Sequence, residues 1–289
     1  MPRPVSFNEE GMNPVRQIAL FGFLSVLLHV ANAPAVTFVT GFVKGEAPAN
    51  AAGGGNLADI VSAATRIWES AVADPVTITL YFGWAEIGEA GNHTIIEQGG
   101  FPNREIMGII LFDNSGASSF YLDPTPDSNE EYRRRTDEYQ DLGGGFVNVA
   151  RIFSDPGGDA AGRTDLLSVA LHEIGHALGM SIANNSFAEA KNAGAIALAA
   201  DLPFSGTVVP LAANHLGFTS HFDPLHVTYG SLMSGIAGDE RRLPSALDIL
   251  ANAQISGFSL LDIDAVPSRG VGRAATPPSL RGRNQTPEP

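Results

Sequence analysis

Residues 165–179, DLLSVALHEIGHALG, constrain the fold of this chain more than any other segment. Apolar side chains recur there at helical spacing, at Leu166, Leu167, Val169, Ala170, Ile174, Ala177 and Leu178. Thr164 is a suitable N-cap for such a helix and Gly179 a suitable stop. The sequence therefore predicts a buried helix over this segment.

Three polar residues interrupt that apolar pattern. His172 and His176 are four residues apart, so their imidazoles lie on one face and can reach the same metal ion. Glu173 follows the first histidine and can hold a water molecule instead of the metal. An exposed polar face would explain a lone pair of histidines, but a buried His or Glu without a partner costs a few kcal/mol. The pattern predicts a metal site, and with 0 cysteines in the chain its ligands must be His, Asp or Glu.

The segment HEIGHALG resembles the metzincin family of zinc endopeptidases, whose compact motif continues to a third histidine three residues after the glycine. This chain has Ile182 at that position, and isoleucine cannot bind zinc. Further along, SHFDPLHVTYGSLMSG contains a segment that looks like the family's Met-turn at Met233. Leishmanolysin-like metzincins carry an insertion before a late histidine, which an aromatic residue follows. His221, followed by Phe222, matches that placement and is the expected third ligand.

Other residues are alternatives for the third ligand. His226 lies closer to the Met-turn, while His215 and Glu189 fall within or near the expected insertion. Single residues of these types are more often plain surface groups than ligands.

The resemblance implies an α+β fold, a metzincin-like zincin catalytic domain. Its twisted mixed sheet and active-site helix would form an upper part, above a mainly irregular and helical lower part. The domain would span residues 34–264, with an insertion at 182–220 that includes an Ala-rich helix at Ser186–Ala200. Met233 and Gly179 would support the site structurally, and Leu243–Asn252 would be the closing helix. Residues 265–289 lack a hydrophobic period and are expected to be a disordered tail.

In this reading His172, His176 and His221 hold zinc (Zn²⁺), and Glu173 is the general base that takes a proton from the zinc-activated water. The expected function is hydrolysis of peptide bonds in protein or peptide substrates. The alternative, raised by Ile182, is a catalytically inactive exported binding or surface protein that keeps a zincin fold.

The N-terminal region predicts export. Arg16 precedes an apolar run over 18–30, and Ala31-Asn32-Ala33 has the small-x-small form of a cleavage site, so residues 1–33 read as a signal peptide. The run is shorter than the about 20 residues of a spanning helix. We expect a secreted, extracellular protein that is exported from a bacterial cell. We also expect that it is a monomer and does not insert stably into a membrane. A formal charge of -14 argues against nucleic-acid partners.

Several other segments predict secondary structure or a minor site. A helix is expected over 57–72, strands over 76–84, 107–112 and 145–153, and a solvated helical face over 127–141. Asp155, Asp159 and Asp165 are compatible with a structural calcium (Ca²⁺) site, although their spacing matches no EF-hand loop.

Overall fold

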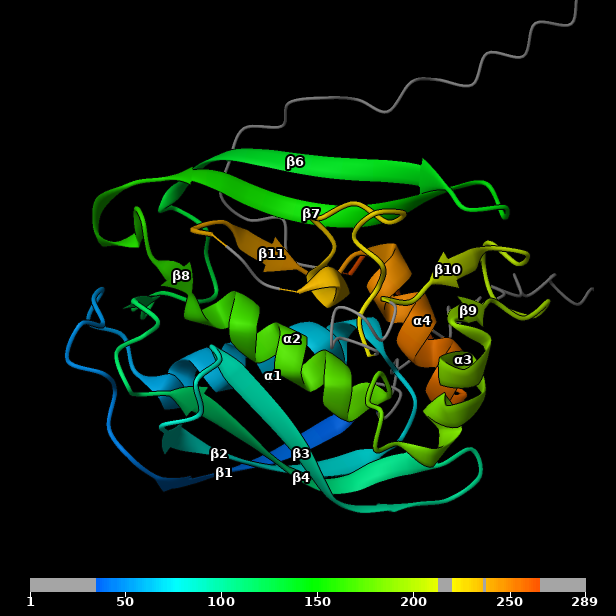
Figure 1. Cartoon of the computed structure of the whole chain (residues 1–289), viewed down its shortest axis with the longest axis horizontal. Coiled ribbons are helices and arrows are strands. Elements are labelled where there is room, and N and C mark those ends of the chain that lie inside the picture. Colours follow the sequence, from blue (N-terminus) through cyan, green and yellow to red (C-terminus); the bar gives the residue numbers. More distant parts are fainter. Residues whose placement is uncertain (1–34, 213–219, 236–237, 266–289) are drawn as a thin grey trace, which may run out of the picture. The chain divides into compact units, whose positions relative to one another are not determined.

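β-Branched and aromatic runs in the first half of the chain pair into a four-stranded sheet. The computed structural model describes residues 35–212, 220–235 and 238–265. The sheet has the order β1-β2-β4-β3, with β1, β2 and β4 parallel and β3 antiparallel at one edge (Figure 1). Its strands are β1 (Thr37–Lys44), β2 (Thr77–Ala85), β3 (Gly91–Gly99) and β4 (Arg104–Asp113).

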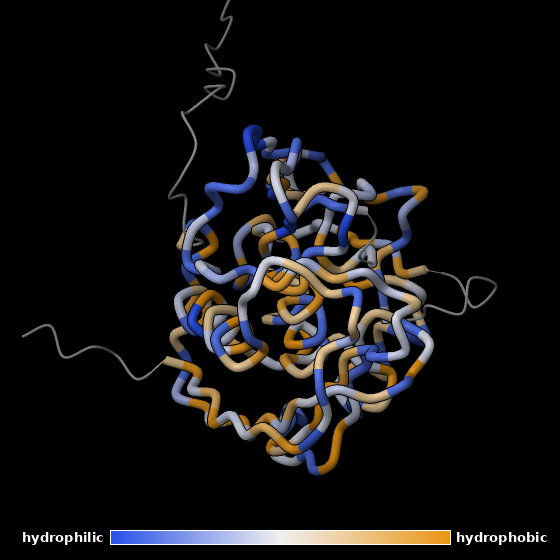
Figure 2. Tube along the Cα trace, turned by 90° about the vertical axis from the view of Figure 1, so that its left-hand side faces the viewer, coloured by the Kyte–Doolittle hydropathy of each residue, from blue (hydrophilic) through white to orange (hydrophobic). Residues whose placement is uncertain are grey.

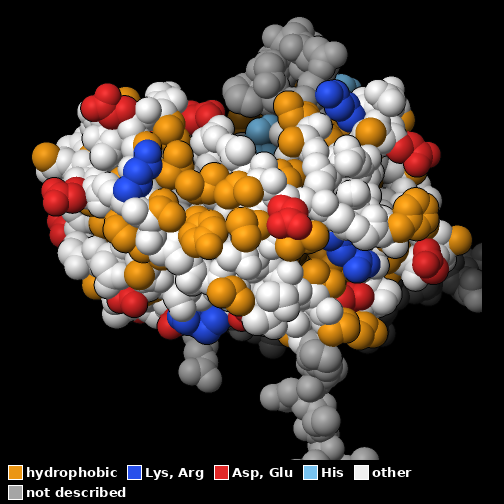
Figure 3. Space-filling model, turned by 90° about the horizontal axis from the view of Figure 1, so that it is seen from below, with side chains coloured by type: hydrophobic (Ala, Val, Ile, Leu, Met, Phe, Trp, Pro, Cys, Tyr) orange, Lys and Arg blue, Asp and Glu red, His pale blue; other side chains and the backbone are white. Residues whose placement is uncertain are grey.

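One face of this sheet packs against two helices. Alternating side chains of β2 are buried on that face, and helix α1 (Leu57–Ala71) turns its apolar residues inward. The indole Nε1 of Trp68 in α1 donates a hydrogen bond to the carbonyl of Leu171 at 3.0 Å, which ties α1 to helix α2 (Leu166–Leu178). Figure 3 views the sheet from its other side, where hydrophobic side chains are present at the surface; Val39 and Phe42 of β1 are exposed.

A second, antiparallel sheet lies on the other side of α2 and has the order β11-β7-β6 (Figure 1). Its strands are β6 (Tyr132–Asp141), β7 (Phe146–Pro156) and β11 (Arg241–Leu243). Short pairs complete the strands, at β5 (Phe120–Tyr121) with β8 (Thr164–Asp165), and β9 (Ala195–Ala197) with β10 (Val208–Pro210). Helices α3 (Ala188–Ala193) and α4 (Ala246–Ser256) follow α2. The described residues thus form a mixed α+β arrangement with several sheets and four α-helices.

The core of this arrangement surrounds α2. All residues of α2 are buried, and α4 is buried along most of its length. Figure 2 shows hydrophobic residues along the coils at the centre of the trace and a mixture of hydrophilic and hydrophobic residues around the outside. In the described part of the chain, no helix is both long and apolar enough to span a bilayer.

Most of the predicted elements are confirmed, and three expectations are wrong. The expected helix over 57–72 is α1, the three expected strands are β2, β4 and β7, and the closing helix is α4. The segment 127–141 is not helical: its last 10 residues form strand β6, whose charged side chains occupy the edge of the second sheet, where charge discourages further pairing. The Ala-rich segment 186–200 forms only the short α3, because Gly194 adopts a left-handed conformation and the chain then enters β9.

The third correction concerns the start of α2. The N-cap is Asp165, not Thr164, since the Asp165 carboxylate accepts hydrogen bonds from the Ser168 backbone N–H at 3.0 Å and from its hydroxyl at 2.7 Å. Thr164 instead pairs with Phe120 in the β5–β8 ladder. The expected stop at Gly179 is confirmed as the C-cap.

The predicted terminal segments lie outside the described residues. All described residues belong to one compact unit. The signal peptide at 1–33 therefore stays a prediction, as does the disordered tail at 265–289, of which only Ala265 is described.

Candidate metal centre

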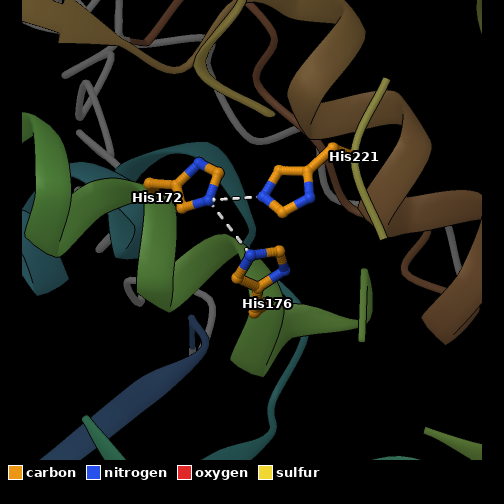
Figure 4. A group of neighbouring side chains, drawn as sticks. All are labelled: His172, His176 and His221. Atoms are coloured by element: carbon orange, nitrogen blue, oxygen red, sulfur yellow. Dashed lines mark hydrogen bonds between the residues drawn. The ribbon is translucent and has the colours of Figure 1, made fainter. Parts of the chain in front are cut away.

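The helix α2 presents two imidazoles to one point. His172 and His176 lie one turn apart on it, 5% and 8% exposed, and their Nε2 atoms are 3.1 Å apart. Figure 4 shows both rings pointing toward the same space beside the helix. The spacing read from the sequence therefore gives the side-by-side arrangement that a shared ligand requires.

His221 completes a group of three. Its Nε2 lies 2.9 Å from that of His172, and its ring faces the other two from a separate segment of the chain (Figure 4). Two backbone hydrogen bonds hold the peptide unit that follows this histidine: Ala212 N–H donates to the His221 carbonyl at 2.8 Å, and Phe222 N–H donates to the Met233 carbonyl at 2.9 Å. The result is a buried His172/His176/His221 triad, consistent with an HExxH-type site on α2.

The alternative third ligands lie elsewhere or outside the described residues. The His226 side chain is 65% exposed and its Nδ1 lies 2.7 Å from the Asp223 carboxylate. Glu189 is an exposed residue of α3, and His215 falls outside the described residues. Ile182, at the position of the compact motif's third histidine, is 56% exposed just after α2 ends.

The hydrogen-bond partner of Nδ1 determines which ring nitrogen is protonated in each of the two helix histidines. His172 Nδ1 lies 2.8 Å from the Leu232 carbonyl, and His176 Nδ1 bonds the Met180 carbonyl. A carbonyl oxygen only accepts, so each Nδ1 carries the proton and donates. Each neutral ring then has a bare lone pair on Nε2, and a hydrogen bond cannot account for their 3.1 Å separation.

Zinc fits this donor set. The two bare Nε2 lone pairs of His172 and His176, directed at one point, repel each other unless a cation lies between them. Tetrahedral zinc with Zn–N bonds of about 2.0–2.1 Å would separate its nitrogen ligands by about 3.3 Å. The 2.9 Å and 3.1 Å separations are close to that value. The group can therefore hold a metal ion such as zinc, bound through the Nε2 atoms of His172, His176 and His221.

Burial keeps the two helix imidazoles in the form that binds a metal. Burial lowers the pKa of His172 to about 4 and the pKa of His176 well below its usual range, and the neighbouring histidines lower the latter further. Both rings are therefore neutral at pH 7 without needing a metal to displace a proton.

Glu173, which follows His172 in α2, is buried, and its side chain faces strand β3. Its side chain packs so closely against Gly91 that a Cβ on that glycine would lie 2.8 Å from Glu173 Oε1. Burial, and to a smaller extent the charge of Glu89, raise the pKa of Glu173 to about 8, against the opposite effect of a hydrogen bond from the His93 backbone N–H. A cation held by the adjacent histidines would lower this pKa, because it stabilises the carboxylate.

Met233 packs directly against α2 and belongs to the short helix of Leu232–Ser234. It is fully buried, and a Cβ added to Gly175 would lie only 2.5 Å from its Sδ. The absence of a side chain at Gly175 therefore allows the turn to approach the metal-binding helix, and this approach brings the Leu232 carbonyl within reach of His172. Sequence reasoning identified Met233 but missed Leu232 and Met180, because a backbone carbonyl leaves no trace in residue type.

Two of the three aspartates of the possible calcium site bind other partners through their carboxylates. Asp155 pairs with Arg133, and Asp165 bonds both Ser168 and the buried Arg241, whose Nη2 lies 2.9 Å from Asp165 Oδ1. The backbone carbonyl of Asp159 accepts from Arg163. Among the residues described, only the three histidines form a group of metal-ligand side chains. No family model, curated protein or solved structure matches this chain.

Proposed function

We propose that this chain is a secreted zinc endopeptidase that hydrolyses protein or peptide substrates. The observation that carries the proposal is the convergence of three imidazole Nε2 atoms beside a helix that also carries the buried carboxyl group of Glu173. A structural zinc site needs no acid–base residue beside its ligands, whereas hydrolysis does. The resemblance to metzincins, with a leishmanolysin-like third histidine, adds the substrate class, and residues 16–33 add export.

In the proposed mechanism the chain's own residues hold the metal and move the proton. His172, His176 and His221 would hold zinc, which supplies Lewis acidity that polarises the substrate carbonyl and lowers the pKa of water towards about 7. Glu173 takes a proton from the attacking water as its oxygen bonds the carbonyl carbon. Glu173 then gives that proton to the amide nitrogen as the C–N bond breaks, which leaves a carboxylic acid and an amine; transfer of the acid's proton to the amine gives a carboxylate and an ammonium group.

The surroundings of Glu173 suit this role. The His93 backbone N–H donates to the carboxyl group and orients it, and Gly91 leaves room for it beside β3. Because the site is buried, the electrostatic interactions that guide the proton are stronger there than in water.

Zinc content and casein cleavage of the purified mature chain test the proposal. Wild type should hold about one zinc per chain and cleave casein. Glu173→Ala should keep zinc and lose activity by about 10²–10⁴-fold, the usual contribution of a general acid–base group. His221→Ala should lose both properties.

His226→Ala is the matched control, since it removes an exposed histidine five positions further along the same segment. It should keep both zinc and activity. Retention of zinc and activity by His221→Ala would contradict the ligand assignment, and equal cleavage by Glu173→Ala would contradict the mechanism. A zinc-loaded wild type without activity on any peptide substrate would favour an inactive binding protein.

A further inference from the structure

Helix α4 carries a buried polar stripe on its otherwise apolar surface. Asp248, Asn252 and Ser256 are four residues apart, so they lie on one face of the helix, and all three are 0% exposed. Each of them makes hydrogen bonds to the region around α2. Buried polar groups need such partners, so the identity of the partners indicates what the stripe does.

Asp248 holds the turn that contains Leu232. Its Oδ1 accepts hydrogen bonds from the Ser231 hydroxyl at 2.9 Å and from the Met233 N–H at 3.0 Å. These two residues flank Leu232, whose carbonyl accepts the 2.8 Å hydrogen bond from His172 Nδ1. The other carboxylate oxygen is held by Ser245 at the start of α4. The position of the Leu232 carbonyl is therefore set from both sides by one buried side chain.

Asn252 holds the backbone at Met180, whose carbonyl contacts the second histidine, His176. Its Oδ1 accepts from the Met180 N–H at 3.3 Å, while its amide donates to the Asp248 carbonyl at 3.1 Å within α4. The Met180 carbonyl accepts the hydrogen bond from His176 Nδ1. Ser256, the third member of the stripe, donates to the Leu178 carbonyl, which neither histidine contacts through a hydrogen bond.

We propose that Asp248 and Asn252 are positioning residues, which fix the two backbone carbonyls that orient the metal-binding rings of His172 and His176. A carbonyl held in place keeps the proton on Nδ1, fixes the ring plane and aims the Nε2 lone pair at the metal. Loss of such an outer contact typically lowers metal affinity by about 10–100-fold. The inference rests on the metal centre of the proposed function and concerns metal affinity, not peptide cleavage.

The test compares Asn252→Ala with Ser256→Ala, which each remove a buried side-chain contact between α4 and the end of α2. The dissociation constants for Zn²⁺ and Co²⁺ are measured by competition with a chromophoric chelator, and the visible absorption of bound Co²⁺ reports ligand geometry. Asn252→Ala should weaken binding by about tenfold or more and alter the Co²⁺ spectrum. Ser256→Ala should retain wild-type affinity and spectrum.

A second comparison, of Ser231→Ala with Ser256→Ala, tests the contacts that position the Leu232 carbonyl. Both substitutions remove only a hydroxyl group. Ser231→Ala removes one of the two hydrogen bonds that flank Leu232. It should therefore weaken Co²⁺ binding several-fold relative to Ser256→Ala, because losing one of two hydrogen bonds should cost about half of the binding free energy that a whole outer contact contributes. The free energy of unfolding of the metal-free variants is measured as the control for stability. If the polar stripe had a structural role alone, Asn252→Ala, Ser256→Ala and Ser231→Ala would all lower that free energy.

Equal metal affinity in all variants, with wild type binding normally, would overturn the positioning role and leave the proposed function intact. Failure of wild type to bind either ion would overturn both, whereas loss of peptide cleavage alone would bear only on the proposed function.

Discussion

At the scale of single residues, each helix histidine is held at both ring nitrogens. A backbone carbonyl takes the proton of Nδ1, and Nε2 is directed at the point shared with His221. Glu173 experiences the same burial with the opposite consequence, because burial favours the neutral form of both an imidazole and a carboxylic acid. The pKa of His172 therefore falls to about 4 while that of Glu173 rises to about 8.

The raised pKa of Glu173 predicts how the stability of the metal-free protein depends on pH. The unfolded Glu173 loses its proton above about 4.5, whereas the folded one keeps it up to about 8. Unfolding thus becomes easier as pH rises between these values, by up to about 1.4 kcal/mol per pH unit from this group. Glu173→Gln is neutral throughout and should lack that contribution.

The measurement is urea unfolding of chelator-treated wild type and Glu173→Gln from pH 5 to pH 8. The histidines titrate in both proteins and cancel in the difference. The free energy of unfolding of Glu173→Gln should rise relative to wild type as pH increases. A difference that does not change with pH would show that Glu173 ionises normally.

At the scale of elements, the sequence predicted those whose hydrophobic period is strong. Helices α1 and α2 and the strands β2, β4 and β7 carry such periods and were expected. Strand β6 was not, because charges occupy most of its positions and leave no alternation to detect. The approach of His221 to α2 is not encoded by any local period either, since it depends on the Met233 turn, and only the resemblance pointed to it.

The end of α2 gives a prediction at this scale. Gly179 has φ +154°, which side-chain-bearing residues rarely adopt, and a Cβ there would lie 2.6 Å from Ser256 Oγ. Gly179→Ala should therefore reduce the free energy of unfolding by about 2 kcal/mol or more through strain and overpacking. Gly194→Ala, at φ +70° with open space around the Cβ, is the control that isolates backbone strain and should cost less. Equal losses in urea unfolding would mean that contact with α4 contributes nothing.

At the scale of the whole molecule, the triad joins segments far apart in the chain. His172 and His176 belong to α2, and His221 follows 45 positions after His176, beyond α3 and the β9–β10 pair. Only the folded chain brings these ligands together, so metal binding and folding are linked. A metal that binds the folded state alone stabilises it according to its free concentration.

This linkage predicts a shift in thermal stability that identifies the ligands without any assay of activity. At free zinc 100 times the dissociation constant, wild type should gain about 2.7 kcal/mol over the chelator-treated protein. For a domain of this size that corresponds to about 5–10 °C in Tm. Glu173→Gln should keep most of the zinc-dependent shift because Glu173 is not a ligand, and His226→Ala should keep all of it. His221→Ala should lose most of the shift, since two imidazoles on α2 bind zinc more weakly than three. A wild-type shift in His221→Ala would mean that the distant segment does not take part in holding the metal.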